Sequence, residues 1–184
     1  MQVNDEVLRQ IVLERERLTT PPHAMSKASG IGIARFVVSC NDAFLVLTLA
    51  KEVMTIVNNY ATQNWPPLER WLNILPSQFI DSFLPELSEV EREKQTKDWD
   101  ALTYEEKLTE ASHDEQWTLS SWLSWMAPNE REWFWWDSIL FDSPLNNSHF
   151  LIEVTTLDSM FMAGSLKCLF KACGAIEVIS EDDL

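Results

Sequence analysis

Residues 150–179 read FLIEVTTLDSMFMAGSLKCLFKACGAIEVI, and this stretch has the clearest local pattern in the chain. β-Branched and aromatic residues dominate 150–156, which predicts a strand. A second strand is predicted at 175–179, where the same residue types return. If the two strands are parallel and lie in one sheet, a helix between them makes the stretch a right-handed βαβ unit.

The residues between these strands predict the connecting helix. Asp158 or Ser159 can cap its N-terminus, and we expect it to run to about Ala172. Gly174 stands where a residue in the left-handed conformation commonly ends a helix. One continuous apolar stripe at helical spacing predicts the buried face: Met162, Leu166, Leu169, Phe170 and Cys173.

Further elements extend this unit toward the N-terminus. A strand is predicted at about 31–39 and a long helix at 41–62, apolar on most sides and therefore packed against the sheet. An amphipathic helix is predicted at 4–18. The fold class that follows is α+β: a mostly helical body with a small sheet of about three strands, 31–39, 150–156 and 175–179. An all-α fold is the alternative.

We expect residues 1–184 to form a single domain, with 86–141 as an acidic, tryptophan-rich helical insertion within it. Thr103 and Glu106 match a capping box, which predicts a helix beginning there. Two aromatic helices are predicted at 118–126 and 129–141, separated by a proline.

Composition restricts the protein classes. Of the 184 residues, 46% are hydrophobic and 23% are charged, which is ordinary globular usage. The three cysteines form no CxxC pair, so we expect free thiols instead of a disulfide framework or a zinc ribbon. The most apolar stretch, 43–57, is interrupted by Lys51 and Glu52 and is too short to span a bilayer. Without a secretory pattern at the N-terminus, we expect a cytoplasmic protein.

Charge is distributed unevenly along the chain. Residues 1–85 carry eight acidic and seven basic side chains, and 86–184 carry twenty-one and seven, so the halves contribute −1 and −14 to the net −15. Such a surface disfavours binding to nucleic acid and to anionic lipid. It would attract a basic protein, with steering that is strongest at low salt. Acidity that serves solubility alone is the other interpretation.

The nine tryptophans concentrate in the middle of the chain, and four aromatic residues run consecutively from Trp133 to Trp136. On the predicted helix they span more than a full turn, so they cannot all face one core. They could be sandwiched between two layers, form an interface with another protein or a second copy, or stack on a flat ligand. The residues predicted to bind a partner are Trp133, Trp135, Trp136, Glu130 and Asp137.

No motif names a reaction. Glu110 and His113 have the Glu-x-x-His spacing of di-metal carboxylate sites, but a second copy is missing, so we predict no metal. His23 and His149 have no neighbouring nucleophile or carboxylate that suggests a triad. No cofactor is predicted.

The resulting hypothesis is a non-catalytic protein-interaction module: an inhibitor, an immunity-type neutraliser or an adaptor. The alternative is an enzyme of unknown class whose dispersed active site uses His113 or His149.

Overall fold

The sheet contains four strands, and every neighbouring pair is antiparallel: β1 (Gly32–Cys40), β2 (Trp133–Leu140), β3 (His149–Thr156) and β4 (Ala175–Ser180). Their order is β2-β3-β1-β4, which leaves β2 and β4 at the edges. The computed structural model describes residues 4–28, 32–103, 105–107, 117–141, 148–157 and 162–183. The predicted α+β class is confirmed, with one strand more than the three expected.

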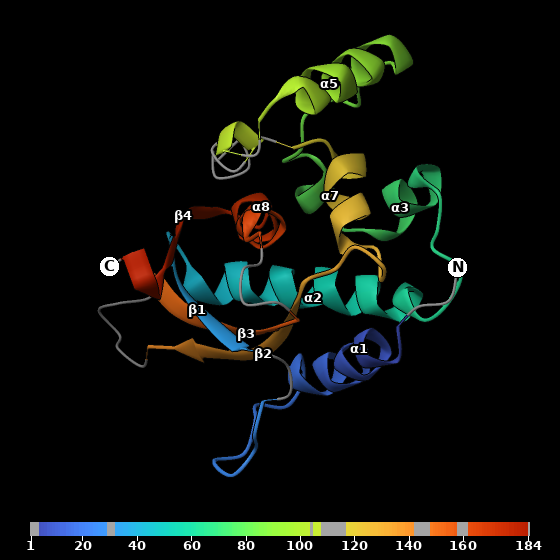
Figure 1. Ribbon diagram of the computed structural model, residues 1–184. Coiled ribbons are helices and arrows are strands. Elements are labelled where there is room, and N and C mark those ends of the chain that lie inside the picture. The colour runs from blue at the N-terminus through green and yellow to red at the C-terminus, as the bar shows by residue number, and fades with distance from the viewer. Residues whose placement is uncertain are drawn as a thin grey trace.

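The helices of the described residues occupy both sides of this sheet (Figure 1). They are α1 (Asp5–Arg17), α2 (Ala43–Ala61), α3 (Leu68–Ile74), α4 (Ser77–Ile80), α5 (Glu89–Ala101), α7 (Leu119–Met126) and α8 (Gly164–Ala172), followed after β4 by a 3-10 turn, η1 (Glu181–Asp183). The predicted helices at 4–18, 41–62 and 118–126 are confirmed. The predicted caps Asp158 and Ser159 lie outside the described residues, and the prediction that one of them caps α8 is wrong, because this helix begins at Gly164 with Ala163 at its N-cap position.

The predicted strand–helix–strand unit, β3-α8-β4, is not a simple βαβ unit, because its two strands are not neighbours in the sheet. β3 and β4 both run antiparallel to β1, so they are parallel to each other, but β1 lies between them. Along the chain the sheet elements follow as β1-α2-β2-β3-α8-β4. This is the β-α-β-β-α-β order of the split βαβ, or ferredoxin-like, arrangement. Such a topology supports many functions and names none.

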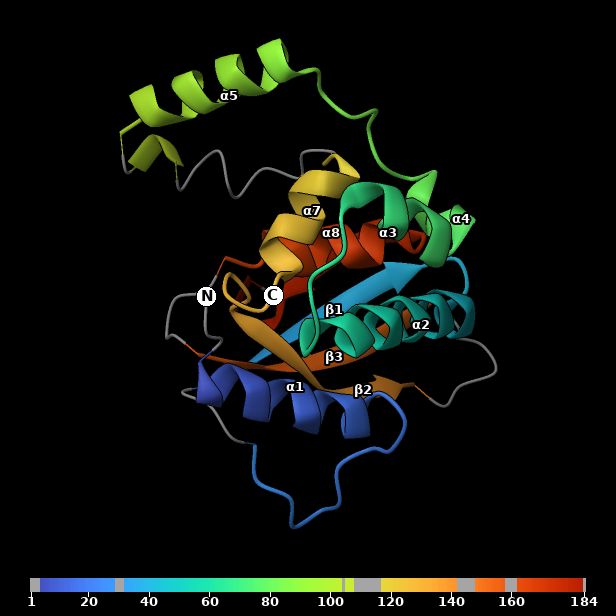
Figure 2. The same cartoon turned by 90° about the vertical axis from the view of Figure 1, so that its right-hand side faces the viewer.

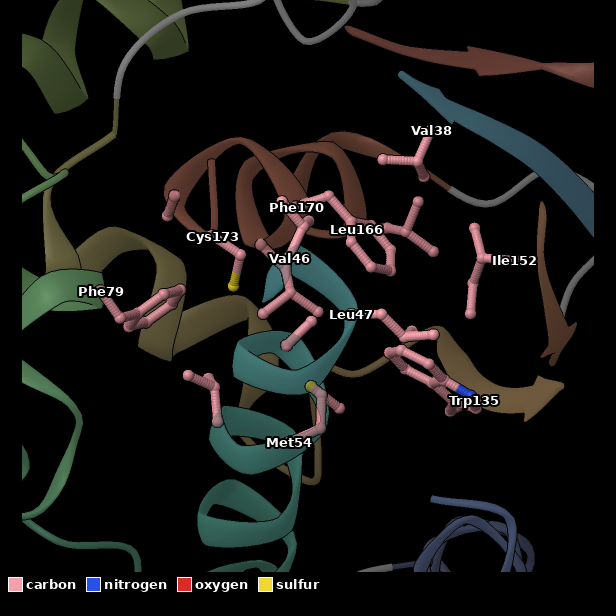
Figure 3. Packing of buried hydrophobic residues seen from close by; sticks show 14 of the residues in the cluster. Val38, Val46, Leu47, Met54, Phe79, Trp135, Ile152, Leu166, Phe170 and Cys173 are labelled. Atoms are coloured by element: carbon pink, nitrogen blue, oxygen red, sulfur yellow. The ribbon is translucent and has the colours of Figure 1, made fainter. Parts of the chain in front are cut away.

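The main core lies between one face of the sheet and the helices α2 and α8 (Figure 3). Val38 and Ile152 of the sheet point toward Leu47, Leu166 and the Phe170 ring (Figure 3). The stripe predicted on α8 is buried here, except that Met162 is only half-buried. Gly174 ends that helix with a φ of 103°, as predicted.

α1 covers part of the opposite face of the sheet (Figure 2). Phe134 of β2 is buried there against Val7 and Ile11 of this helix. The Thr155 hydroxyl of β3 donates a 3.1 Å hydrogen bond to Gln10. The sheet is therefore covered on both faces at the end where β2 begins.

The prediction of a helix at 129–141 is wrong, because residues 133–140 form the strand β2. Trp133 and Trp135 point into the main core, while Phe134 between them packs under α1. Covered on both faces, this part of the strand has no polar positions, and without a polar–apolar alternation it resembles a buried helix in sequence. Trp136 is the extra residue of a β-bulge between Trp135 and Asp137.

The chain leaves the body of the protein after Leu84 and returns to it at Trp117, and these two residues lie side by side. We call the segment between them the excursion. The Leu84 N–H donates a 2.9 Å hydrogen bond to the carbonyl of Trp117, and Leu84 forms a parallel bridge with Thr118. Between these points lies α5, which has no buried residue and stands apart from the sheet (Figures 1 and 2). The predicted capping box that follows is confirmed, since the Thr103 N–H donates to Glu106 at 2.8 Å.

A buried ion pair joins three elements. The side chains of Arg131 and Glu14 are both fully buried, with nitrogen–oxygen distances of 2.5 and 2.6 Å. Arg131 also donates to the Asn58 side chain of α2 at 2.9 Å and to the Trp133 carbonyl at 3.1 Å. The Glu14 carboxylate accepts the Trp135 N–H at 2.6 Å. α1, α2 and β2 are thus tied together by one charged group of each sign.

Removing one member of this pair should cost about 3–5 kcal/mol of unfolding free energy, because the other charge stays buried and unpaired. We expect this loss for Glu14→Leu and for Arg131→Met in denaturant titrations. The double variant should recover only part of it, since the outward N–H of Trp135 and C=O of Trp133 lose their partners, at about 1–3 kcal/mol for each orphaned group. A double variant as stable as the native protein would contradict this role.

Gly174→Ala should destabilise the protein by about 1–2 kcal/mol, because a side chain disfavours the left-handed backbone. Crowding is not the cause, since an added Cβ would meet only Val46 Cγ2 at 3.7 Å. Gly174→Asn serves as the control and should lose less, because asparagine tolerates this conformation. Equal losses in thermal unfolding would point to sterics.

Candidate protein-interaction surface

Beyond α1, the second face of the sheet carries an apolar row. Strand register places Ile139, Leu151, Val37 and Ile179 side by side across all four strands. Side chains alternate along a strand, so this row lies on the same face as Thr155 and α1. Ile139 is 43% exposed, and the other three are half-buried. We call this row and its surroundings the open face.

Acidic residues border the open face at β4. Glu177 lies on the exposed side of this strand, and the turn η1 directly after it adds Glu181, Asp182 and Asp183. All four are exposed. We call these four residues the acidic edge, and along the chain they lie on both sides of Ile179, where the apolar row ends.

Arg35 forms ion pairs with two acidic residues of this region. Its Nε donates to Glu153 on the neighbouring strand at 2.6 Å, and its second nitrogen lies 3.5 Å from Glu181. The hydrogen bond to Glu153 raises the pKa of Arg35 above its ordinary value. Because Glu153 takes the shorter contact, Arg35 neutralises the centre of the sheet more than the acidic edge.

The three tryptophans predicted to bind a partner are all buried. Trp133 and Trp135 are each 1% exposed and Trp136 is 6% exposed, the last under the Arg17 guanidinium, whose carbon lies 4.8 Å from the ring centroid. The Trp133 indole N–H donates to the Ser165 hydroxyl at 2.9 Å. These side chains therefore offer a partner little surface, and Trp133 and Trp135 are part of the main core between the sheet and the helices.

The two predicted acidic residues lie apart from each other. Glu130 is exposed in the turn before β2, where its N–H donates to the Ala127 carbonyl. Asp137 lies at the outer edge of β2, and its carboxylate accepts the Ser138 N–H at 2.8 Å. Burial lowers the pKa of Lys51 on α2, and the Asp137 charge opposes that shift. The five predicted residues do not form one exposed surface.

Of the two histidines that the enzyme hypothesis names, the structure describes only His149. His113 and Glu110 lie outside the described residues. His149 is half-buried at the start of β3, with its Nδ1 2.8 Å from the Ser148 hydroxyl. Within the described ranges, no three histidine, cysteine, aspartate or glutamate side chains are grouped as metal ligands would be. The enzyme hypothesis stays a prediction.

The cysteines behave as interior thiols. Cys40 and Cys173 are buried and Cys168 is half-buried, and all three are free. Burial raises the pKa of Cys168 to about 12 and that of Cys173 further. Thiols this hard to ionise are poor nucleophiles, so these residues suit packing better than catalysis.

No protein-family model, no curated protein and no solved structure matches this chain. Among the helices that the structure describes, none combines the length and the apolar character needed to cross a membrane. In the sequence, only the cluster Glu181, Asp182 and Asp183 indicates the acidic edge, whereas the open face requires the strand register.

The buried position of Trp135 predicts a large effect on stability. Trp135→Ala should lower the free energy of unfolding by about 3–5 kcal/mol, as expected for a large aromatic removed from a core. Trp99→Ala on α5 is the matched control, and because that helix buries no residue its effect should stay within about 0.5 kcal/mol. Chemical denaturation of both variants measures the difference. Equal effects would contradict the assignment of Trp135 to the core.

Proposed function

We propose that this chain is a cytoplasmic, non-catalytic interaction module that binds a basic protein through the acidic edge and the adjoining open face. The observation that carries the proposal is the placement of four exposed carboxylates at the end of a partly exposed apolar row. Interfaces commonly combine an apolar centre with a polar rim, and this surface has both parts.

The sign of the charge defines the partner. Glu177, Glu181, Asp182 and Asp183 contribute −4 within a few residues, against Arg35 as the nearby cation. A basic surface brought against them would be attracted over about 10 Å at 0.1 M salt. Complementary charge also raises association rates and rejects partners of the wrong sign. Inhibitors, immunity-type neutralisers and adaptors are classes of protein that act in this way.

A second copy of the chain suits this surface poorly. Each copy carries a net charge of −15, and face-to-face pairing would bring two acidic edges together. We therefore favour a different, basic protein over a homodimer. Light scattering at low and high salt checks this point, since a self-association driven by the apolar row would persist or strengthen as salt screens the repulsion.

Charge reversal at the acidic edge tests the proposal. The variant Glu177→Lys/Asp182→Lys should lose the basic protein that the native chain captures from its own cell lysate, weakening binding by about tenfold or more. The matched control is Glu93→Lys/Asp98→Lys on α5, which changes net charge by the same amount at exposed positions away from the sheet. We expect the control to keep the partner.

The outcomes distinguish binding at the acidic edge from attraction by the net charge of the whole protein. Loss in the edge variant alone supports the proposed surface, and the purified pair should then dissociate as salt rises. Equal loss in both variants would mean that net charge alone attracts the protein. Unchanged capture by the edge variant would sink the proposal.

A further inference from the structure

The two edge strands of the sheet differ in how their outward backbone groups are satisfied. On β2, side chains hold three of them: Arg131 donates to the Trp133 carbonyl, while Glu14 and Asp137 accept the N–H groups of Trp135 and Ser138. These bonds block much of that edge against another strand. Capping of this kind is one way in which proteins prevent unwanted strand pairing.

No side chain in the described part of the protein protects β4 in this way. One side of the strand pairs with β1 from Phe36 to Cys40. Across the described ranges, no hydrogen bond reaches the outward backbone groups of Ala175–Ser180 from a side chain or another strand. Ile176 is 61% exposed on this strand. The open edge, an exposed apolar side chain and the acidic edge thus coincide on one element.

Charge makes this edge selective. Glu177 within the strand and the acidic turn after it would repel the β4 edge of a second copy, since both edges carry the same sign. The same charges attract lysine or arginine on an incoming strand. A strand edge that repels the same edge of a second copy, and whose outward backbone groups are unpaired, favours a partner strand of opposite charge.

We propose that the basic partner binds by adding an extended segment to the free edge of β4. The inference rests on the proposed function and specifies its mode of binding. On the open face, Glu177 and Ile179 lie two residues apart in β4, and Glu181 follows at the start of the turn η1, 3.5 Å from Arg35. A strand laid beside them matches with basic, apolar and basic side chains at the same intervals. The recognised segment therefore reads basic-x-apolar-x-basic, with its apolar residue facing Ile179.

A synthetic peptide with this pattern, Thr-Lys-Thr-Ile-Thr-Lys-Thr, tests the mode. Titrated into the full chain, it should shift the amide NMR signals of Ala175–Ser180 and slow their hydrogen exchange. Two further peptides carry N-methyl groups at alternate residues, one in each register. Only one register faces β4, so one N-methylated peptide should bind about tenfold or more weakly and the other should bind normally, because main-chain hydrogen bonds are lost on one side only.

Variants of the protein check the same edge. Ile176→Lys places a cation on β4 and should weaken peptide binding by about tenfold or more through like-charge repulsion. Leu72→Lys on α3 is the matched control, since Leu72 is 47% exposed and lies outside the sheet. It should bind the peptide as the native protein does.

The outcomes distinguish this inference from the proposed function. If both N-methylated peptides bind as well as the parent, charge attracts the peptide without strand pairing, and strand addition is overturned while the acidic edge stands. If no peptide binds but the edge variant Glu177→Lys/Asp182→Lys still loses the cellular partner, strand addition again falls alone. If neither the peptide nor the partner responds to the edge, both proposals fall.

Discussion

The buried pair between Arg131 and Glu14 is the constraint on which the rest of the structure depends. It lies where α1, α2 and β2 meet, and it satisfies backbone groups of an edge strand that no other strand reaches. A buried ion pair is a poor source of net stability unless further hydrogen bonds complete it, and here they do. The pair occupies outward backbone groups of β2 at one edge of the sheet, while the strand order leaves β4 at the other edge.

Local patterns in the sequence correctly predicted the elements that depend mainly on residue type and periodicity. The strands around α8, the cap at Gly174 and the long helix α2 follow from residue type and period. The error at 129–141 has a physical cause, because a strand buried on both faces loses its alternation and a bulge at Trp136 interrupts it further. For the same reason the tryptophans were predicted to bind a partner when they are buried.

The candidate surface could not be predicted in the same way, because it exists only through strand register. Ile139 and Leu151 are twelve positions apart, and Val37 lies more than a hundred from either, yet pairing aligns them in one row. The imbalance of charge between the halves of the chain was visible in sequence. Its concentration beside an unpaired strand depends on β4 lying at the end of the sheet, beyond β1.

The joint at Leu84 and Trp117 has a consequence for how this chain can change over evolutionary time. A segment that departs and returns at neighbouring points, where Leu84 bonds to Trp117 and Glu86 accepts the Ser120 N–H, places little geometric demand on the sheet. Insertions, deletions and rapid drift in sequence can accumulate there while the strands keep their register. Any related chains should then differ most in this excursion, and the rest of the body could carry a shorter turn, or another module, in its place.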